Sequence, residues 1–360
     1  MLLLEKGMIG MAQNLIQIQN RSNDILNGYS WTLKDKNLSK GNIVIITGMQ
    51  ETAARYAESA KFFNDHGYNV YCLDHYGQGE NAGVNNELLG EWPLSGFRKF
   101  VNTVDDLVIE LRISCRPTYI IGHSLGSFIL QDYIQRHTEH ISKVVFVGTG
   151  RKVMTPKLGY RLASMLVPLP KYKIQTDENG NRTKVLRKPE DQIPWYKLNK
   201  TLHNLSLGNA NRRVEQQLKR LVKEGKIPPE EAEPHKYAWL SRDEMIVDLY
   251  DKDPLCGGIN KGGFYREFFK GLRRLNQRKF LKKIRPSLSI LVVAGEDDPV
   301  GNFGKEPKRL AEVYQKMGVK DVQLKIYKEM RHEILNEIGR QEVLEDILSF
   351  IEEKKHNACE

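Results

Sequence analysis

The sequence predicts an α/β protein whose mostly parallel central sheet is covered by helices on both faces and interrupted by an inserted helical subdomain. Short apolar runs alternate along the chain with amphipathic stretches, which is typical of parallel sheets that are buried on both faces. The alternation stops near residue 150 and resumes near residue 287. Charge changes at the same places. Residues 151–285 hold 31 Lys and Arg against 15 Asp and Glu, a net charge of +16, whereas the remaining residues carry −6.

The elements of the sheet follow in order from the amino terminus. Residues 14–19 and 28–33 alternate apolar and polar side chains, which predicts an antiparallel pair at the edge of the sheet. Strands that are mostly buried on both faces are predicted from short apolar runs at 42–47, 69–74, 118–121, 143–148, 289–295 and 322–327. Covering helices are predicted from amphipathic patterns at 52–66, 97–113, 125–137, 305–317 and 339–354.

The middle of the chain has a different organisation. Amphipathic helices are predicted at 157–167, 209–225, 241–250 and 263–283. Residues 176–194 are polar and rich in turn formers, and the prolines of 226–234 mark a break. We therefore predict a core formed by residues 1–150 and 286–360, and a basic, mostly helical cap formed by residues 151–285.

The composition narrows the class of protein. Four cysteines, Cys72, Cys115, Cys256 and Cys359, lie far apart and form no CxxC pair, which disfavours a zinc site or a disulfide framework and fits a reducing compartment. The opening apolar patch contains three leucines, and no stretch approaches the roughly 18 apolar residues of a membrane span. We expect a cytoplasmic protein without a metal or another cofactor.

The basic segment 151–285 is either a solvated surface or a contact for an anionic partner. A patch of this kind can meet nucleic acid, an anionic membrane surface or acidic ligands. No nucleic-acid recognition motif accompanies it, so nucleic-acid binding is not expected. Its amphipathic helices suit peripheral contact with an anionic membrane.

A candidate nucleophile lies in the stretch "YIIGHSLGSF", where a predicted strand becomes a predicted helix. Ser124 stands between Gly122 and Gly126, in a G-x-S-x-G pattern. A sharp strand-to-helix turn leaves little room beside the serine, which explains small flanking residues and exposes the hydroxyl at the carboxyl end of the sheet. The alternative is a glycine-rich turn with an incidental serine.

A serine hydroxyl needs a base to take its proton. His332 follows the last predicted strand, so it belongs to the sheet edge where ligand sites gather. His75 also follows a strand and is its rival. His123 belongs to the turn itself, with its ring expected to point away from the serine. The order in the chain favours His332.

The base needs a carboxylate to orient it, and an acyl-transfer site needs two N–H donors for the oxyanion. Asp297 and Asp298 both follow strand 289–295, and either carboxylate could serve. The backbone N–H of Leu125, at the helix start, is one candidate donor. The other is the N–H of Met49, in the loop after strand 42–47.

Together these residues resemble the α/β-hydrolase superfamily and, within it, the monoacylglycerol lipase and lysophospholipase group. "GMQETAARY" is similar to that group's G-x-x-E-x-x-x-R-Y segment, "LDHYGQGEN" to its D-H-x-G-x-G-x-S segment and "GHSLGS" to its elbow. "GEDDPVG" and "MRHEILNE" resemble its acid and histidine segments, and residues 239–258 the end of its helical cap. The resemblance implies that Asp298, before Pro-Val, is the acid. Thr47 and Asn81 depart from the group's usual His and Ser.

The resemblance implies a serine carboxylic-ester hydrolase that cleaves a single-chain lipid, a lysophospholipid or monoacylglycerol, through an acyl-enzyme on Ser124. Two alternatives stay open. An aminopeptidase would need a carboxylate in the cap to hold the substrate's amine, for which Asp243, Asp248 and Asp251 are candidates. The other alternative is a non-catalytic binding protein on a hydrolase scaffold.

Overall fold

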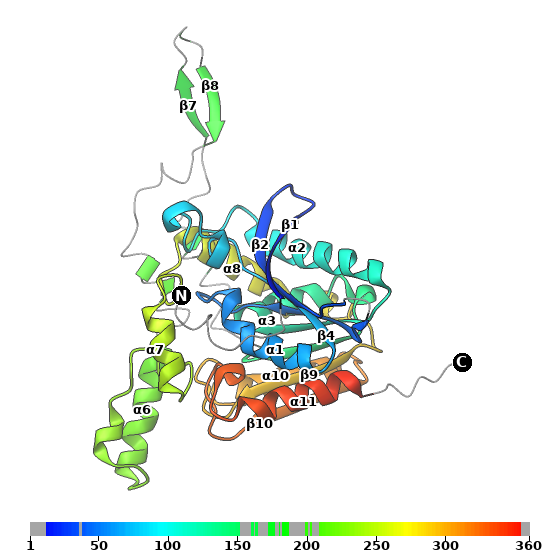
Figure 1. The fold of residues 1–360 in the computed structure, drawn as a ribbon. Helices are drawn as coiled ribbons and strands as arrows, with labels where there is room; N and C mark the ends of the chain where they lie inside the picture. The colour runs from blue at the N-terminus through cyan, green and yellow to red at the C-terminus, as the bar shows by residue number, and fades with distance from the viewer. Residues whose placement is uncertain are drawn as a thin grey trace.

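The computed structural model describes residues 12–35, 38–151 and 209–353, with short pieces between 160 and 203. Its centre is an eight-stranded sheet in the order β1-β2-β4-β3-β5-β6-β9-β10. Figure 1 shows this sheet with helices packed around it. The strands are β1 (Ala12–Gln19), β2 (Ile25–Thr32), β3 (Gly41–Ile46), β4 (Tyr68–Leu73), β5 (Thr118–His123), β6 (Lys143–Val147), β9 (Ser289–Gly295) and β10 (Asp321–Tyr327). All pairs from β4 to β10 are parallel, and the edge pair β1–β2 is antiparallel. This confirms the predicted sheet.

Helices cover both faces of the sheet. They are α1 (Ala57–Asp65), α2 (Gly96–Leu111), α3 (Leu125–Ile134), α8 (Gly262–Leu275), α10 (Lys305–Lys316) and α11 (Arg340–Glu352). Short 3-10 helices are η2 (Ala53–Tyr56), η3 (Gly79–Asn81), η4 (Val84–Asn86), η5 (Arg112–Ser114), η6 (Thr138–His140), η8 (Pro229–Ala232) and η9 (Ile334–Asn336). Side chains of α2, α3, α8 and α10 join one buried cluster, and those of α1 and α11 join the other.

The strands divide their side chains between these two clusters because successive residues of a strand point to opposite faces. Val44 and Ile46 of β3 belong to the first cluster, whereas Ile43 and Ile45 belong to the second. Both faces are therefore apolar, which is why the sequence shows continuous apolar runs in place of alternation.

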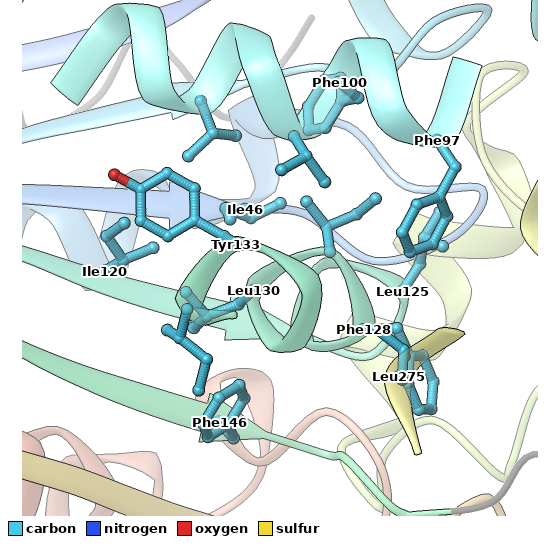
Figure 2. Close-up of a cluster of buried hydrophobic side chains, with 14 of the residues drawn as sticks. Ile46, Phe97, Phe100, Ile120, Leu125, Phe128, Leu130, Tyr133, Phe146 and Leu275 are labelled. Atoms are coloured by element: carbon cyan, nitrogen blue, oxygen red, sulfur yellow. The ribbon is translucent and has the colours of Figure 1, made fainter. Parts of the chain in front are cut away.

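Helix α3 lies in the middle of the first cluster, between the sheet and α2 (Figure 2). The labelled side chains there are Leu125, Phe128, Leu130 and Tyr133 of α3, Ile46, Ile120 and Phe146 of the sheet, Phe97 and Phe100 of α2, and Leu275 of α8. Full burial of an aliphatic or aromatic side chain contributes about 1.5–3 kcal/mol. Packing on two sides therefore holds the first turn of α3, which follows Ser124, in a fixed position.

The order of the strands creates a natural site at the carboxyl ends of β3 and β5. From β3 the chain moves outward to β4 and then returns to the other side of β3 as β5. Ligands of open α/β sheets bind where the strand order reverses in this way. The loop after β3 contains Met49, and the turn after β5 contains Ser124. The topology thus brings two sequence-distant candidate segments together.

The middle of the chain contains strands that the sequence did not predict. β7 (Tyr172–Thr176) and β8 (Arg182–Leu186) form a separate antiparallel pair in a region expected to be helical or turn-rich. The predicted helix at 263–283 is also divided, because α8 ends at Leu275 and α9 (Arg278–Leu281) follows. The predicted helix at 157–167 lies mostly outside the described residues.

Two further helices belong to this segment, α6 (Ala210–Lys223) and α7 (Glu244–Lys252). Asp243 begins α7 as an N-cap, since its side chain accepts from the N–H groups of Met245 and Ile246. Within the described ranges, no helix is long and apolar enough to cross a membrane. The limits of the cap, 151–285, stay a prediction.

Asn81, one of the two departures from the resembled group, has a structural use in this chain. Its side-chain amide donates to the carbonyl of Asp74, and its oxygen accepts from the N–H of Asn27, 2.8 Å away in both cases. Asn81 therefore joins the end of β4 to the neighbouring strand β2.

Candidate active site

Ser124 occupies a strained turn between β5 and α3. Its backbone has φ 50° and ψ −114°, a conformation that a residue with a side chain rarely adopts. Its N–H donates to the carbonyl of Val147 at 3.0 Å, and its carbonyl accepts from the hydroxyl of Ser127 at 2.6 Å. These bonds hold the strained geometry that the G-x-S-x-G pattern predicts.

The flanking glycines are required by close approaches of the backbone. A Cβ on Gly126 would overlap the carbonyl oxygen of Ile46, at the end of β3. A Cβ on Gly122 would lie 2.7 Å from the carbonyl oxygen of Gly126. Because both positions lack a side chain, α3 can begin directly against β3 and β5.

His332 lies against this turn. A Cβ on Gly148, at the end of β6, would lie 3.2 Å from Cε1 of His332 and 3.3 Å from Cδ2 of His123. The rings of His123 and His332 have centroids 5.1 Å apart. His332 is 1% exposed, and among the described residues its Nε2 has no hydrogen-bond partner. The structure therefore brings the predicted base beside the residue that precedes Ser124.

Asp298 meets His332 from the loop after β9. Its Oδ2 lies 3.0 Å from Nδ1 of His332, and both side chains are buried. Burial on its own would raise the pKa of Asp298. The contact with His332 and the N–H groups of Gly301 and Val300 outweigh burial, so the pKa of Asp298 is lowered and the carboxylate stays charged.

Asp297 has different partners from Asp298, so the structure distinguishes the two candidate acids that the sequence could not. Its Oδ1 accepts from the amide of Gln217 on α6 at 2.6 Å. Its Oδ2 pairs with the guanidinium of Arg242. Asp297 therefore joins the acid loop to residues of the predicted cap, and Asp298 is the carboxylate at His332.

His75, the rival base, is turned into the core. Its Nε2 lies 2.9 Å from the carbonyl oxygen of Thr47. Its ring packs on Phe100, with centroids 4.1 Å apart, and beside Trp92. Burial lowers the pKa of His75 to about 4, which keeps the ring neutral. His75 thereby holds the chain at the end of β3, at Thr47, where the resembled group usually has His.

The two predicted oxyanion donors lie in the loops that flank this site. Leu125 is the first residue of α3, and Met49 lies in the loop at 47–52, here named the oxyanion loop. Both residues are buried. Within the described part of the chain, neither backbone N–H has a hydrogen-bond acceptor. Two free N–H groups, one in the oxyanion loop and one at the start of α3, suit a developing negative charge.

Residues that the sequence analysis did not assign surround these loops. Glu51 accepts from the N–H of Gly48, next to Met49, and from the hydroxyl of Tyr56 at 2.7 Å. Arg55 joins Glu51 to Glu333, the neighbour of His332. The sequence carried a signal for them, because Glu51 and Arg55 have the i, i+4 spacing of a helical ion pair and Glu333 adjoins the candidate base.

The segment before α7 covers the histidine. The ring of Trp239 lies 5.2 Å from that of His332. The N–H of Glu333 donates to the carbonyl of Leu240 at 2.7 Å, and the guanidinium of Arg331 donates to that of Ala238, also at 2.7 Å. Among the described residues no group of three or more His, Cys, Asp or Glu side chains could hold a metal ion.

Comparison with known proteins identifies the family. Residues 38–339 match the family model described as serine aminopeptidase, S33, a family of α/β-hydrolases. The chain belongs to this family. The predicted fold class and the predicted resemblance are therefore confirmed.

Relatives of this α/β-hydrolase have lipase names. A monoacylglycerol lipase of Mycolicibacterium smegmatis is 25% identical over 317 residues, which cover 87% of this chain and 88% of that protein. Lysophospholipase L2 of Escherichia coli K12 is 33% identical over 100 residues, which cover 26% of this chain and 28% of that protein. This chain is therefore a hydrolase whose homologues include lipases and lysophospholipases.

Solved structures share its fold. A carboxyl esterase from Bacillus coagulans has a TM-score of 0.73 at 23% identity, covering 95% of this chain and 98% of that one. A monoglyceride lipase from Saccharomyces cerevisiae, in complex with a substrate analog, has a TM-score of 0.62 at 15% identity, covering 96% and 95%. At these identities the likeness concerns the fold of the α/β-hydrolase alone.

Proposed function

We propose that this α/β-hydrolase is a serine carboxylic-ester hydrolase that cleaves single-chain lipid esters, a lysophospholipid or a monoacylglycerol. The observation that carries the proposal is the buried contact of 3.0 Å between Asp298 and His332 beside the strained turn at Ser124. A buried carboxylate against an imidazole is the arrangement that prepares a histidine to take a serine proton.

The reaction follows from these positions. The Ser124 hydroxyl attacks the ester carbonyl while Nε2 of His332 takes its proton, and Asp298 stabilises the imidazolium that forms. The N–H groups of Met49 and Leu125 stabilise the oxyanion of the tetrahedral intermediate. Collapse of the intermediate breaks the bond to the alcohol, which leaves with the proton from His332. Water then attacks the acyl-enzyme by the same route and releases the fatty acid.

The lipid substrate class is supported by the activities after which two relatives are named, a monoacylglycerol lipase and lysophospholipase L2. We expect kcat/KM for a long-chain monoacylglycerol or lysophospholipid to exceed that for an amino-acyl p-nitroanilide by at least about 100-fold. An acyl chain that enters an apolar pocket adds about 0.8 kcal/mol of transfer free energy for each buried methylene.

The test is an activity profile over monoacylglycerols, lysophospholipids, short p-nitrophenyl esters and amino-acyl anilides, each below its aggregation concentration. The Ser124→Ala variant, measured beside the native chain, subtracts any contaminating esterase. Preferred hydrolysis of the anilides would reject the lipid-ester assignment in favour of an aminopeptidase.

The three acidic side chains considered for an aminopeptidase are engaged elsewhere. Asp243 caps α7, Asp248 pairs with Lys252 at 3.2 Å, and Asp251 pairs with Lys236 at 3.0 Å. None of these partners belongs to the loops that contain Ser124, Asp298 or His332. This arrangement favours the ester substrate over a substrate with a free amine.

We also propose that α6 gives the enzyme peripheral contact with anionic membranes. Its outer face carries the exposed cations Lys219, Arg220 and Lys223, whereas Val214 is buried on the opposite side. Exposed cations of this kind are attracted to an anionic interface, where each contributes on the order of 1 kcal/mol.

Charge reversal tests the membrane proposal. We expect K219E/R220E/K223E to lower co-sedimentation with phosphatidylserine-containing vesicles by at least about tenfold at low salt. The matched control reverses three cations outside the cap, K308E/K316E/K320E, all exposed. Equal recovery of the native chain with neutral and anionic vesicles, or equal losses in the two variants, would contradict a role for α6.

A further inference from the structure

A cluster of four titratable side chains, three of them buried and one partly buried, joins the loops of the candidate site. The four are Glu51, Arg55, His123 and Glu333, with side-chain exposures of 2%, 13%, 5% and 2%. We name them the charge cluster. Glu51 belongs to the oxyanion loop, His123 precedes Ser124, and Glu333 follows His332. The cluster therefore touches all three segments that must be aligned for catalysis.

The contacts within the charge cluster are close and directional. The guanidinium of Arg55 donates to both carboxylate oxygens of Glu333, at 2.7 and 2.6 Å, and to Oε2 of Glu51 at 2.9 Å. Nδ1 of His123 lies 2.8 Å from Oε1 of Glu51. Two loops far apart in the sequence are thereby linked through one arginine, with a geometry that lysine cannot reproduce.

A count of the charges in the cluster supports a protonated His123. Two buried carboxylates and one guanidinium leave one negative charge without a partner. An uncompensated charge in a buried site is strongly unfavourable. His123 is the remaining titratable group in contact with Glu51, apart from the hydroxyl of Tyr56. A protonated His123 makes the charge cluster neutral.

The acid–base behaviour of the pair agrees with this count. Burial disfavours the charged form of both groups, but their mutual attraction outweighs it. The pKa of Glu51 is lowered to about 2, mainly because the charges of His123 and then of Arg55 oppose the effect of burial. The pKa of His123 is raised above its ordinary value, because the charge of Glu51 outweighs burial.

The ring of His123 also lies beside the candidate base, His332. Its centroid lies 5.1 Å from that of His332, which otherwise contacts the carboxylate of Asp298 and the ring of Trp239. A positive charge at this distance disfavours a second one on His332. Asp298 acts in the opposite direction. A positive ring of His123 at this distance therefore favours the state in which His332 can accept the serine proton.

We propose that His123 is a positioning residue that is protonated at neutral pH, neutralises the charge cluster linking the oxyanion and histidine loops, and keeps His332 neutral in the resting enzyme. The statement about the charge of His123 concerns the folded protein alone. The statement about His332 rests on the proposed function, so two separate measurements are needed.

The first measurement is the ¹⁵N spectrum of histidine-labelled native protein at pH 7.5. The signal of His123 is identified by its loss in H123Q. We expect both ring nitrogens at imidazolium shifts, although an ordinary histidine is mostly neutral at this pH. Shifts of a neutral tautomer at pH 7.5 would overturn the proposal, whether or not the protein hydrolyses any ester.

The second measurement is the pH profile of kcat/KM for H123Q and E51Q. In both variants we expect the acidic limb to move to higher pH, so that the loss of activity relative to the native chain is about tenfold larger at pH 6 than at pH 8.5. E51Q removes the charge that holds the proton on His123, so E51Q/H123Q should show no further shift.

The matched control is D132N, which removes a buried carboxylate held by Arg136 and Arg274 on the far part of α3. It should leave the shape of the profile unchanged. Melting temperature and fluorophosphonate labelling identify any variant that fails to fold. Acidic limbs that coincide in the native chain, H123Q and E51Q would refute the effect on His332. Failure of native protein to label with the probe would instead refute the proposed function.

Discussion

Ser124→Ala is expected to lower kcat/KM for an ester substrate by a factor on the order of 10⁴ to 10⁶. The alanine variant keeps the turn but lacks the oxygen that forms the acyl-enzyme, and removal of the nucleophile from such a triad has effects of this size. The measurement is the initial rate of hydrolysis of a p-nitrophenyl ester, with enzyme concentrations corrected for purity.

A matched control for this variant is Ser59→Ala. Ser59 is also a buried serine, but it lies on α1, on the opposite face of the sheet from α3. Its removal should change kcat/KM by less than about threefold. Retention of most esterase activity in Ser124→Ala, in a preparation free of other hydrolases, would contradict the assignment of the nucleophile.

Asp298→Asn is expected to lower kcat by about 10⁴-fold, because an amide cannot stabilise the imidazolium and favours the wrong tautomer of His332. Asp297→Asn is the matched control, since it changes the neighbouring residue in the same way. Asp297 contacts Gln217 and Arg242, so its replacement should lower kcat by less than about tenfold. The two kcat values, measured at saturating ester and pH 8, check the pair.

The comparison of kcat in Asp297→Asn and Asp298→Asn can also contradict the assignment of the acid. A larger loss of kcat in Asp297→Asn than in Asp298→Asn would mean that the acid loop rearranges when substrate binds. The role of the contact between Asp298 and His332 would then be structural.

The sheet could be predicted from the sequence because its strands are buried on both faces. The strands β3, β5, β6 and β9 appear in the sequence as apolar runs that do not alternate with polar residues. Stretches with the amphipathic pattern of helices separate these runs. Ser124 could be predicted for a similar reason, since a strained turn with close backbone approaches restricts its neighbours to glycine. Local constraints of this kind can be recognised from the residue types alone.

The sequence was less informative where a partner distant in the chain decides the outcome. Asp297 and Asp298 are adjacent and identical, and only Gln217, Arg242 and His332 distinguish them. His75 and His332 both follow strands, but aromatic packing on Phe100 makes the first a buried neutral ring. Such differences depend on long-range contacts that periodicity does not record.

The β7–β8 pair and the charge cluster show two other limits. β7 and β8 lie in a polar stretch, where the apolar pattern that predicts buried strands is absent. Glu51, Arg55 and Glu333 resemble ordinary surface charges in the sequence. The burial of Glu51 and Glu333, and the contact of both with Arg55, arise only when three loops meet.

The measurement that tests the account most directly is peptide mapping of the native protein after reaction with a fluorophosphonate. The account predicts one adduct per chain, on the oxygen of Ser124, with no adduct in Ser124→Ala and much slower labelling in His332→Ala. An adduct on another residue, undiminished labelling of Ser124→Ala, or an unlabelled native protein that is folded by circular dichroism would contradict it.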